Sequence, residues 1–308
     1  MTLESQAVSP PSTLRAWAAA VRPPSLLLAL APVGVGASMG YWQSGALDWK
    51  LAALALAAAV LMQLITNLQN DVGFTTRGAQ HLGAHTGLPR ATTMGWLSTR
   101  QVRIAILILS VLACGLGLSL VALRGWPVLA MGVASLCAAL AYMGGPRPIA
   151  YTAFGELTVF VFFGLVAVLG TQWLLTGGVS IGGLMAAVAV GALAAAALVV
   201  NNHRDIAHDH LAGRRTFAVT WGQTASWRLY RILLSATWVM PVLMALALRQ
   251  PWMLLPLVLL PRTLALQKVF TPTATGAACN AILIRTFWLE MWFSILLSTA
   301  AMLARVSH

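Results

Sequence analysis

Long apolar runs separated by short polar segments make up most of this chain. Nine of these runs are about 17–24 residues long, which is the length of helix needed to cross the hydrocarbon core of a bilayer. The pattern therefore predicts an all-α integral membrane protein with nine transmembrane helices. The predicted spans are residues 25–44, 50–69, 102–123, 126–143, 153–175, 180–200, 227–247, 252–270 and 286–304.

The composition supports this interpretation. Of the 308 residues, 59% are hydrophobic and 8% are charged, whereas roughly a quarter of the residues of a soluble domain are charged. A single globule with this balance could not hide its apolar surface from water. Most of that surface must therefore face lipid.

The formal net charge of +12 reflects membrane topology rather than a nucleic-acid surface. If the N-terminus is cytoplasmic, the cytoplasmic side carries 15 of the 19 Lys and Arg residues. The other side keeps only Lys50, Arg124, Arg249 and Arg305. This is a strong positive-inside asymmetry. We expect residues 1–24 to form a cytoplasmic N-terminal segment without a removable signal peptide, followed by one nine-helix domain over residues 25–304.

Two longer polar loops resemble each other and lie on the predicted cytoplasmic side, at about residues 70–101 and 201–226. Each begins where an apolar run ends, opens with amides and an Asp, and soon reaches a Gly beside an Arg. The chain has only seven Asp and Glu residues, and Asp71, Asp205 and Asp209 all lie here. The repetition indicates two half-sites that face one cavity.

The second loop has the spacing expected of a metal site. Asn202, Asp205 and Asp209 are three and four residues apart, so a continuing helix would place them on one face. Magnesium takes oxygen ligands and commonly binds one or two carboxylates together with substrate phosphates. Nearby arginines could hold phosphate oxygens, namely Arg77, Arg204, Arg214 and Arg215. The alternative is that these polar residues only mark the water interface.

Four segments carry a resemblance to a known family: "VRPPSLLLALAPVGVG" (21–36), "NLQND" (67–71), "AYMGGPRPIAYTAFGELTVFVFFG" (141–164) and "NNHRDIAHDHLAGRRTFAVTWG" (201–222). With these the chain resembles the UbiA superfamily of intramembrane aromatic prenyltransferases. It is most similar to the menaquinone branch, the 1,4-dihydroxy-2-naphthoate polyprenyltransferases. The resemblance implies nine helices around a central cavity, with both Asp loops cytoplasmic.

The same resemblance implies the chemistry. An isoprenoid diphosphate would lie with its tail among the helices and its headgroup at the two Asp loops, bridged by Mg²⁺. A polyprenyl group would then be transferred to an aromatic acceptor, 1,4-dihydroxy-2-naphthoate, in quinone biosynthesis at the bacterial inner membrane. The implied partners are these two substrates and membrane lipid, with no nucleic acid.

The resemblance also assigns roles to individual residues. As catalytic residues it implies Asp71, Asp205, Tyr142 and Arg147. As substrate-binding residues it implies Asn67, Asn70, Arg77, Arg90, Arg147, Asn202 and Arg214. As metal ligands it implies Asn70, Asp71, Asp205 and Asp209. Glu156 would support the site without binding metal.

One departure from the family pattern affects the first loop. The family's first motif reads N-D-x-x-D with a further Asp downstream, but this chain has Phe74 and Gln80 at those two positions. Three explanations stay open. In the first, the site holds one metal while arginines take over part of the diphosphate charge. In the second, the substrate or the metal stoichiometry has changed. In the third, the protein binds quinone or isoprenoid lipid without catalysis.

A transporter would also have many spans and polar helix ends. It is disfavoured because the polar clusters lie at one face of the predicted bundle, whereas transporter sites usually lie near the middle of the membrane.

Overall fold

The computed structural model describes residues 11–78 and 90–307, and this part of the chain contains helices and no strands. The elements are α1 (Thr13–Val21), α2 (Pro23–Ser44), α3 (Trp49–Thr76), α4 (Thr99–Arg124), α5 (Trp126–Met143), η2 (Ile149–Tyr151), α6 (Gly155–Val159), η3 (Phe160–Leu169), α7 (Gly170–Thr176), α8 (Ile181–Arg204), α9 (Ile206–Leu211), α10 (Phe217–Leu248), η4 (Pro251–Leu259), α11 (Leu260–Val269) and α12 (Gly276–Val306). The predicted all-helical fold is confirmed for these residues.

Eight helical segments of the described chain are long and apolar enough to cross a membrane, against nine predicted spans. They correspond to the second to ninth predicted spans. The first predicted span coincides with α2, a helix of 22 residues. The helices also extend further than predicted, because α3 continues to Thr76 and α10 begins at Phe217, both inside the segments expected to be loops.

Side-chain caps fix several helix starts. Asp48 accepts hydrogen bonds from the backbone N–H groups of Lys50 and Leu51 at the start of α3. Ser98 and Gln101 form a reciprocal capping box at the start of α4. These contacts satisfy N–H groups that have no partner within the helix. The chain therefore re-enters a helix at defined residues at the starts of α3 and α4.

A ten-residue π-helical segment, η3, interrupts the span from α6 to α7. Its wider turn brings Phe162, Phe163 and Val166 to the wall of the central cavity described below. The segment packs closely on α8 through two glycines: a Cβ added at Gly164 would lie 2.7 Å from the Cα of Gly191. π-helical segments occur often at functional sites, and this one forms a cavity wall.

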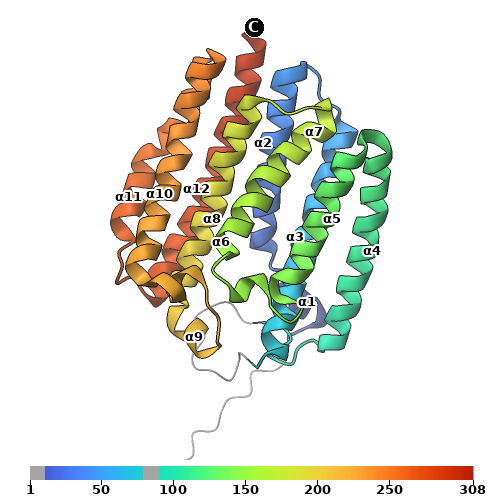
Figure 1. Ribbon diagram of the computed structural model, residues 1–308, viewed down its shortest axis with the longest axis vertical. Coiled ribbons are helices and arrows are strands. Elements are labelled where there is room, and N and C mark those ends of the chain that lie inside the picture. Colours follow the sequence, from blue (N-terminus) through green and yellow to red (C-terminus); the bar gives the residue numbers. More distant parts are fainter. Residues whose placement is uncertain (1–10, 79–89, 308) are drawn as a thin grey trace, which may run out of the picture.

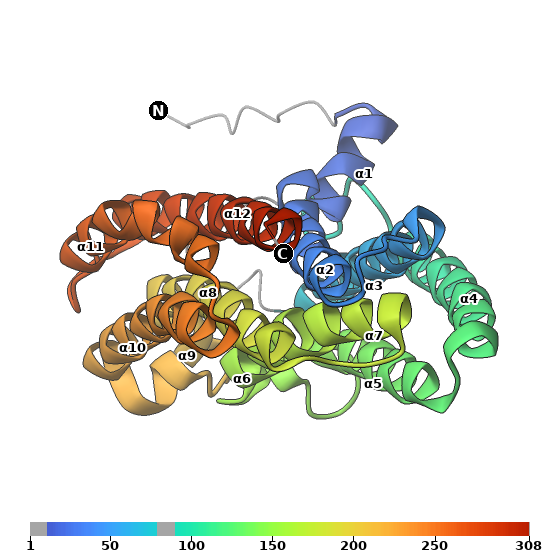
Figure 2. The same ribbon diagram turned by 90° about the horizontal axis from the view of Figure 1, so that it is seen from above.

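The central helix is α8, which contacts α10, η3, α12 and α2. Its run of small buried residues around Ala192–Ala197 lets these neighbours approach. Figure 2 shows α2 beside α12 and α3, with α4 and α11 at opposite ends of the elongated outline.

The two polar regions meet at one end of the bundle. Figure 1 shows α9 and the end of α3 at the same end, while the C-terminus lies at the other. Residues far apart in sequence can therefore contribute to one site.

Candidate active site

A cavity of about 740 Å³ extends from this polar end into the bundle. Its inner walls are mostly apolar, with Phe162, Phe163 and Leu136 among the lining residues. At its polar end the lining side chains are Arg22, Ser25, Gln63, Asn67, Asn70, Arg90, Tyr142, Asn201, Asn202, Arg204, Asp205 and Arg214. The cavity thus combines a charged mouth with an apolar interior.

The second polar loop begins with a break in the helix. α8 ends at Arg204, Asp205 is its C-cap, and α9 starts at the next residue. The guanidinium of Arg204 binds both oxygens of Asp205, at 2.8 and 2.6 Å, and also donates to Asn201 and Asn280. Asp205 is therefore held at the cavity mouth by its neighbour in sequence.

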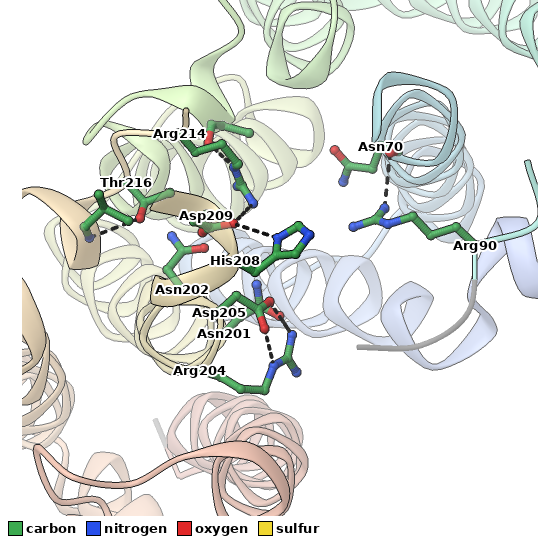
Figure 3. A network of polar contacts seen from close by, with 12 residues as sticks. Asn70, Arg90, Asn201, Asn202, Arg204, Asp205, His208, Asp209, Arg214 and Thr216 are labelled. Atoms are coloured by element: carbon green, nitrogen blue, oxygen red, sulfur yellow. Dashed lines mark hydrogen bonds and ion pairs between the residues drawn. The ribbon is translucent and has the colours of Figure 1, made fainter. Parts of the chain in front are cut away.

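Asp209 lies deeper, fully buried on α9, and it does not line the cavity. Its Oδ1 accepts a hydrogen bond of 2.5 Å from Arg214, whose Nε donates to the backbone oxygen of Ala150. Burial raises the pKa of the Asp209 carboxyl, and the charge of Arg214 opposes that rise. Figure 3 shows this pair next to His208 and Asp205.

Asn202 and Glu156 connect α8 to α6. The amide of Asn202 donates to Oε1 of Glu156 at 2.9 Å. The oxygen of the Asn202 amide and Oε2 of Glu156 are buried and have no hydrogen-bond partner in the described part of the chain. The same is true of Oδ2 of Asp209. Buried oxygens without donors are costly, and a bound cation would satisfy them.

The first polar region is the last part of α3. Asn67 is buried and donates to the backbone oxygen of Val21 and to Ser25, each at 2.7 Å, so it ties α3 to the end of α1 and the start of α2. Asn70 lies one turn further on and lines the cavity, with its buried Oδ1 unpartnered among the described residues. Both amides are thus brought to the cavity mouth.

Asp71 has a different environment from the one expected of a metal ligand. Its Oδ2 accepts from the backbone N–H of Ala91 and its Oδ1 from that of Thr92, both at 2.9 Å, and the Thr92 hydroxyl also donates to Oδ1. The side chain is fully buried and does not line the cavity. In this structure Asp71 faces the 90–95 turn rather than Asp205 and Asp209. To contact a metal ion in the cavity, its carboxylate would have to leave these three donors.

Phe74, which stands where the family has an Asp, is buried between the two loops. The Cζ of Arg90 lies 4.0 Å from the centroid of its ring, and the His208 ring stacks on it at 5.5 Å with an interplanar angle of 12°. Arg90 also donates to the backbone oxygen of Asn70 at 3.1 Å. Figure 3 shows Asn70 and Arg90 opposite His208 across the site.

Two arginines at the mouth have no ion pair with a carboxylate within the described residues. They are Arg22, between α1 and α2, and Arg90. Burial and the neighbouring Arg22 lower the pKa of Arg90 to about 9, so its guanidinium stays protonated at neutral pH. Two half-buried cations without an ion pair among the described residues favour an anionic ligand.

Some predicted residues lie elsewhere. Arg147 is exposed and does not line the cavity. Arg77 is exposed, donates to the backbone oxygen of Gly145, and lines a separate pocket together with Arg103. Tyr142 does line the main cavity, whereas Gln80 is outside the described residues. The sequence does not predict Arg22 as a site residue, because it falls in the predicted N-terminal segment. The two prolines that follow it mark the start of α2 and thus place Arg22 at a helix end.

The donor set at the second loop fits one Mg²⁺ ion. Within the described residues no three His, Cys, Asp or Glu side chains converge into a complete metal site. However, Mg²⁺ needs only one or two carboxylates when substrate phosphates and water supply the rest. Asn202 and Asp205 line the cavity, and Oδ1 of Asn202 has no hydrogen-bond partner among the described residues. Asp205 would bind the ion in exchange for contacts with Arg204, and Asp209 would have to turn its unpartnered Oδ2 toward the cavity.

An all-helical membrane bundle with an apolar cavity, a mouth of arginines and carboxylates, and donors for a divalent ion is the architecture of an intramembrane enzyme that handles a lipid diphosphate. The model of the UbiA prenyltransferase family matches residues 29–296, so the chain belongs to this family. The predicted family and the predicted prenyltransferase class are therefore confirmed.

Similar proteins support this assignment. The chain is 38% identical over 248 residues to the 1,4-dihydroxy-2-naphthoate octaprenyltransferase of Mycobacterium tuberculosis, covering 80% of this chain and 83% of that one. It is 35% identical over 234 residues to the Escherichia coli protein of the same name, covering 74% and 75%. The fold matches a UbiA homologue from Archaeoglobus fulgidus bound to GPP and Mg²⁺, with a TM-score of 0.66 and 16% identity over 92% of this chain and 99% of that chain.

Proposed function

We propose that this protein transfers a polyprenyl group from a polyprenyl diphosphate to 1,4-dihydroxy-2-naphthoate in the cytoplasmic membrane of a bacterium, with Mg²⁺. The observation that carries the proposal is the cavity, because its arginine-lined mouth suits a diphosphate and its apolar interior suits an isoprenoid tail. The acceptor is inferred from the names of the relatives from M. tuberculosis and E. coli.

The two ends of the cavity bind different parts of the polyprenyl diphosphate. Arg22, Arg90 and Arg214 hold diphosphate oxygens, while Phe162 and Phe163 pack against the first part of the tail. The bond between the allylic carbon and oxygen breaks, and the diphosphate leaves with the electron pair. An aromatic carbon of the acceptor then forms the new carbon–carbon bond. The ring becomes aromatic again when this carbon releases a proton or, if it carries the carboxylate, CO₂, with the bonding electron pair remaining in the ring. The apolar wall excludes water, which would otherwise capture the cationic carbon.

Asp205, Asp209, Asn202 and Asn70 would hold the metal, and Tyr142 would lie beside the reacting centre. A bound Mg²⁺ neutralises charge on the departing diphosphate. Glu156 orients Asn202 through their hydrogen bond. Arg77 and Arg147, outside the cavity, are proposed to bind diphosphate only during its entry.

We also propose a topology with nine spans, with α2 as the first, and a cytoplasmic N-terminus. This orientation places the Asp loops and the water-soluble acceptor on the same side of the membrane. The positive-inside asymmetry supports it.

The test is turnover by the purified full chain in lipid nanodiscs, given a polyprenyl diphosphate, 1,4-dihydroxy-2-naphthoate and Mg²⁺. We expect a prenylated acceptor by mass spectrometry, with or without its carboxyl group, and its loss on adding EDTA or in Asp205→Ala. Cysteine labelling from either side checks the topology. If no acceptor is prenylated but a labelled isoprenoid or quinone still binds, the protein is a lipid-binding relative rather than an enzyme.

A further inference from the structure

Where the family pattern has a second carboxylate, this chain has the phenyl ring of Phe74, which lies against the guanidinium of Arg90. Three residues from a single stretch of α3 surround Arg90: the backbone oxygen of Asn70 accepts its hydrogen bond, Asp71 holds the turn that follows it, and the ring of Phe74 lies against it. Arg90 has no ion pair with a carboxylate in the described part of the chain.

The donors that the described residues place on this side do not fit a second metal ion. Phe74 has no atom that can bind Mg²⁺, and both oxygens of Asp71 already accept hydrogen bonds from the 91–92 backbone. Among the described residues of this side, Asn70 has a buried oxygen without a hydrogen-bond partner and lines the cavity. A single amide oxygen is a poor ligand set for an ion that prefers carboxylates and phosphates.

We propose that Arg90, held against the end of α3, binds the diphosphate directly in place of a second metal ion, and that Phe74 and Asp71 are positioning residues for Arg90. This inference rests on the proposed function for the identity of the ligand. It leaves one metal ion, which Asp205, Asp209 and Asn202 of the second loop would hold with Asn70 as a further ligand. The guanidinium replaces the charge of the missing ion and can make two parallel hydrogen bonds to phosphate oxygens.

The physical role of the phenyl ring follows from its contacts. A ring face attracts a guanidinium without neutralising it, so the charge stays available for an anion. A carboxylate at the same position would pair with Arg90 and compete with the diphosphate. The stacking of His208 on the ring links this arrangement to α9 in the second loop.

The experiment measures binding of inorganic diphosphate to the full chain in nanodiscs by calorimetry, in EDTA and in Mg²⁺. In EDTA we expect measurable binding by the wild type, about tenfold weaker binding by Phe74→Leu, and binding within about twofold of wild type by Phe74→Tyr, which keeps the ring. Arg90→Gln should lose as much as the double variant Arg90→Gln/Phe74→Leu, because the ring acts through the guanidinium.

Asp71→Asn separates the two roles of that carboxylate. If Asp71 positions Arg90, this variant should bind diphosphate more weakly than the wild type already in EDTA. If Asp71 were a metal ligand, the variant would lose only the additional diphosphate binding that Mg²⁺ provides. A matched control is Trp227→Leu, which removes another ring from beneath an arginine, Arg231 at 4.8 Å, away from the cavity. This control should bind diphosphate as the wild type does, and thermal unfolding should verify that every variant folds.

Three results would overturn the proposal: no metal-free binding by the wild type, unchanged binding by Phe74→Leu, or higher turnover in Phe74→Asp. Failure of the proposed function has a different signature. In that case diphosphate would bind as described while no acceptor is prenylated.

Discussion

The side chains of Asn202 and Glu156 are joined by a hydrogen bond of 2.9 Å, which links the last turn of α8 to the first turn of α6. Both groups are buried, and each keeps one oxygen without a partner among the described residues. The pair therefore fixes the direction in which the second oxygen of Asn202 points.

Removing the hydrogen-bond acceptor at position 156 should impair the site more than removing only the negative charge of Glu156. We expect Glu156→Ala to lower kcat about tenfold, because the buried Asn202 amide loses an acceptor worth about 1–3 kcal/mol. Glu156→Gln, whose carbonyl oxygen can still accept, should keep most of the activity. Steady-state kinetics in nanodiscs provides the measurement. If the Gln variant is as impaired as the Ala variant, the site needs the negative charge of Glu156 and not only its hydrogen bond.

The ion pair of Asp209 and Arg214 predicts a pH dependence. Because burial raises the pKa of Asp209, the ionised form that could bind a metal ion is lost at a higher pH than for an ordinary Asp. Transfer should therefore decline as the pH falls through this raised pKa. The stability contribution has the opposite sign: the folded state binds the proton more tightly than the unfolded chain, so this stabilisation is complete below the unfolded pKa and is lost as the pH rises through the folded one.

Arg214→Gln tests the cause. Without the guanidinium that lowers the pKa of Asp209, the acidic limb of kcat/KM should move to higher pH. Arg231→Gln removes an arginine outside the cavity and should leave the limb in place. If the fall of kcat/KM at acidic pH occurs at the same pH in Arg214→Gln as in the wild type, a group other than Asp209 controls it.

The close approach of η3 to α8 predicts a packing effect. A Cβ at Gly164 would lie 2.6 Å from the backbone oxygen of Ala187, so Gly164→Ala must push the cavity wall away from α8. Overpacking of this kind costs about 1–3 kcal/mol, and we expect a lower Tm in detergent together with slower transfer. Gly34→Ala is the control, because a Cβ there meets nothing within 4 Å. Equal Tm values for the two variants would contradict the packing argument.

The sequence predicts the second polar loop better than the first. The spacing of Asn202, Asp205 and Asp209 is local, and the chain does continue from α8 into α9 with only a break at Asp205. The apolar runs likewise locate most spans, because the bilayer sets their length. These features depend on neighbours within a few residues.

The surroundings of Asp71 and Phe74 could not be predicted in this way. Asp71 accepts hydrogen bonds from residues twenty positions further along, and Phe74 stacks on a residue of α9. Sequence alone shows that a carboxylate is missing at position 74 but not what the replacement contacts. The π-helical turn of η3 is also invisible in a purely apolar run, since it arises from packing against α8.

Glu290 provides a last prediction, because it is a carboxyl group buried within the transmembrane helix α12. It is 1% exposed, and neither carboxylate oxygen has a hydrogen-bond partner within the described residues. It does not line the cavity. A polar group buried without partners costs about 1–3 kcal/mol, so Glu290→Leu should raise Tm by a few degrees and leave kcat unchanged. Glu290→Gln, which stays polar, should give a smaller gain. Should Glu290→Leu instead lose activity at unchanged or higher Tm, the carboxyl takes part in function through a state in which it finds a partner.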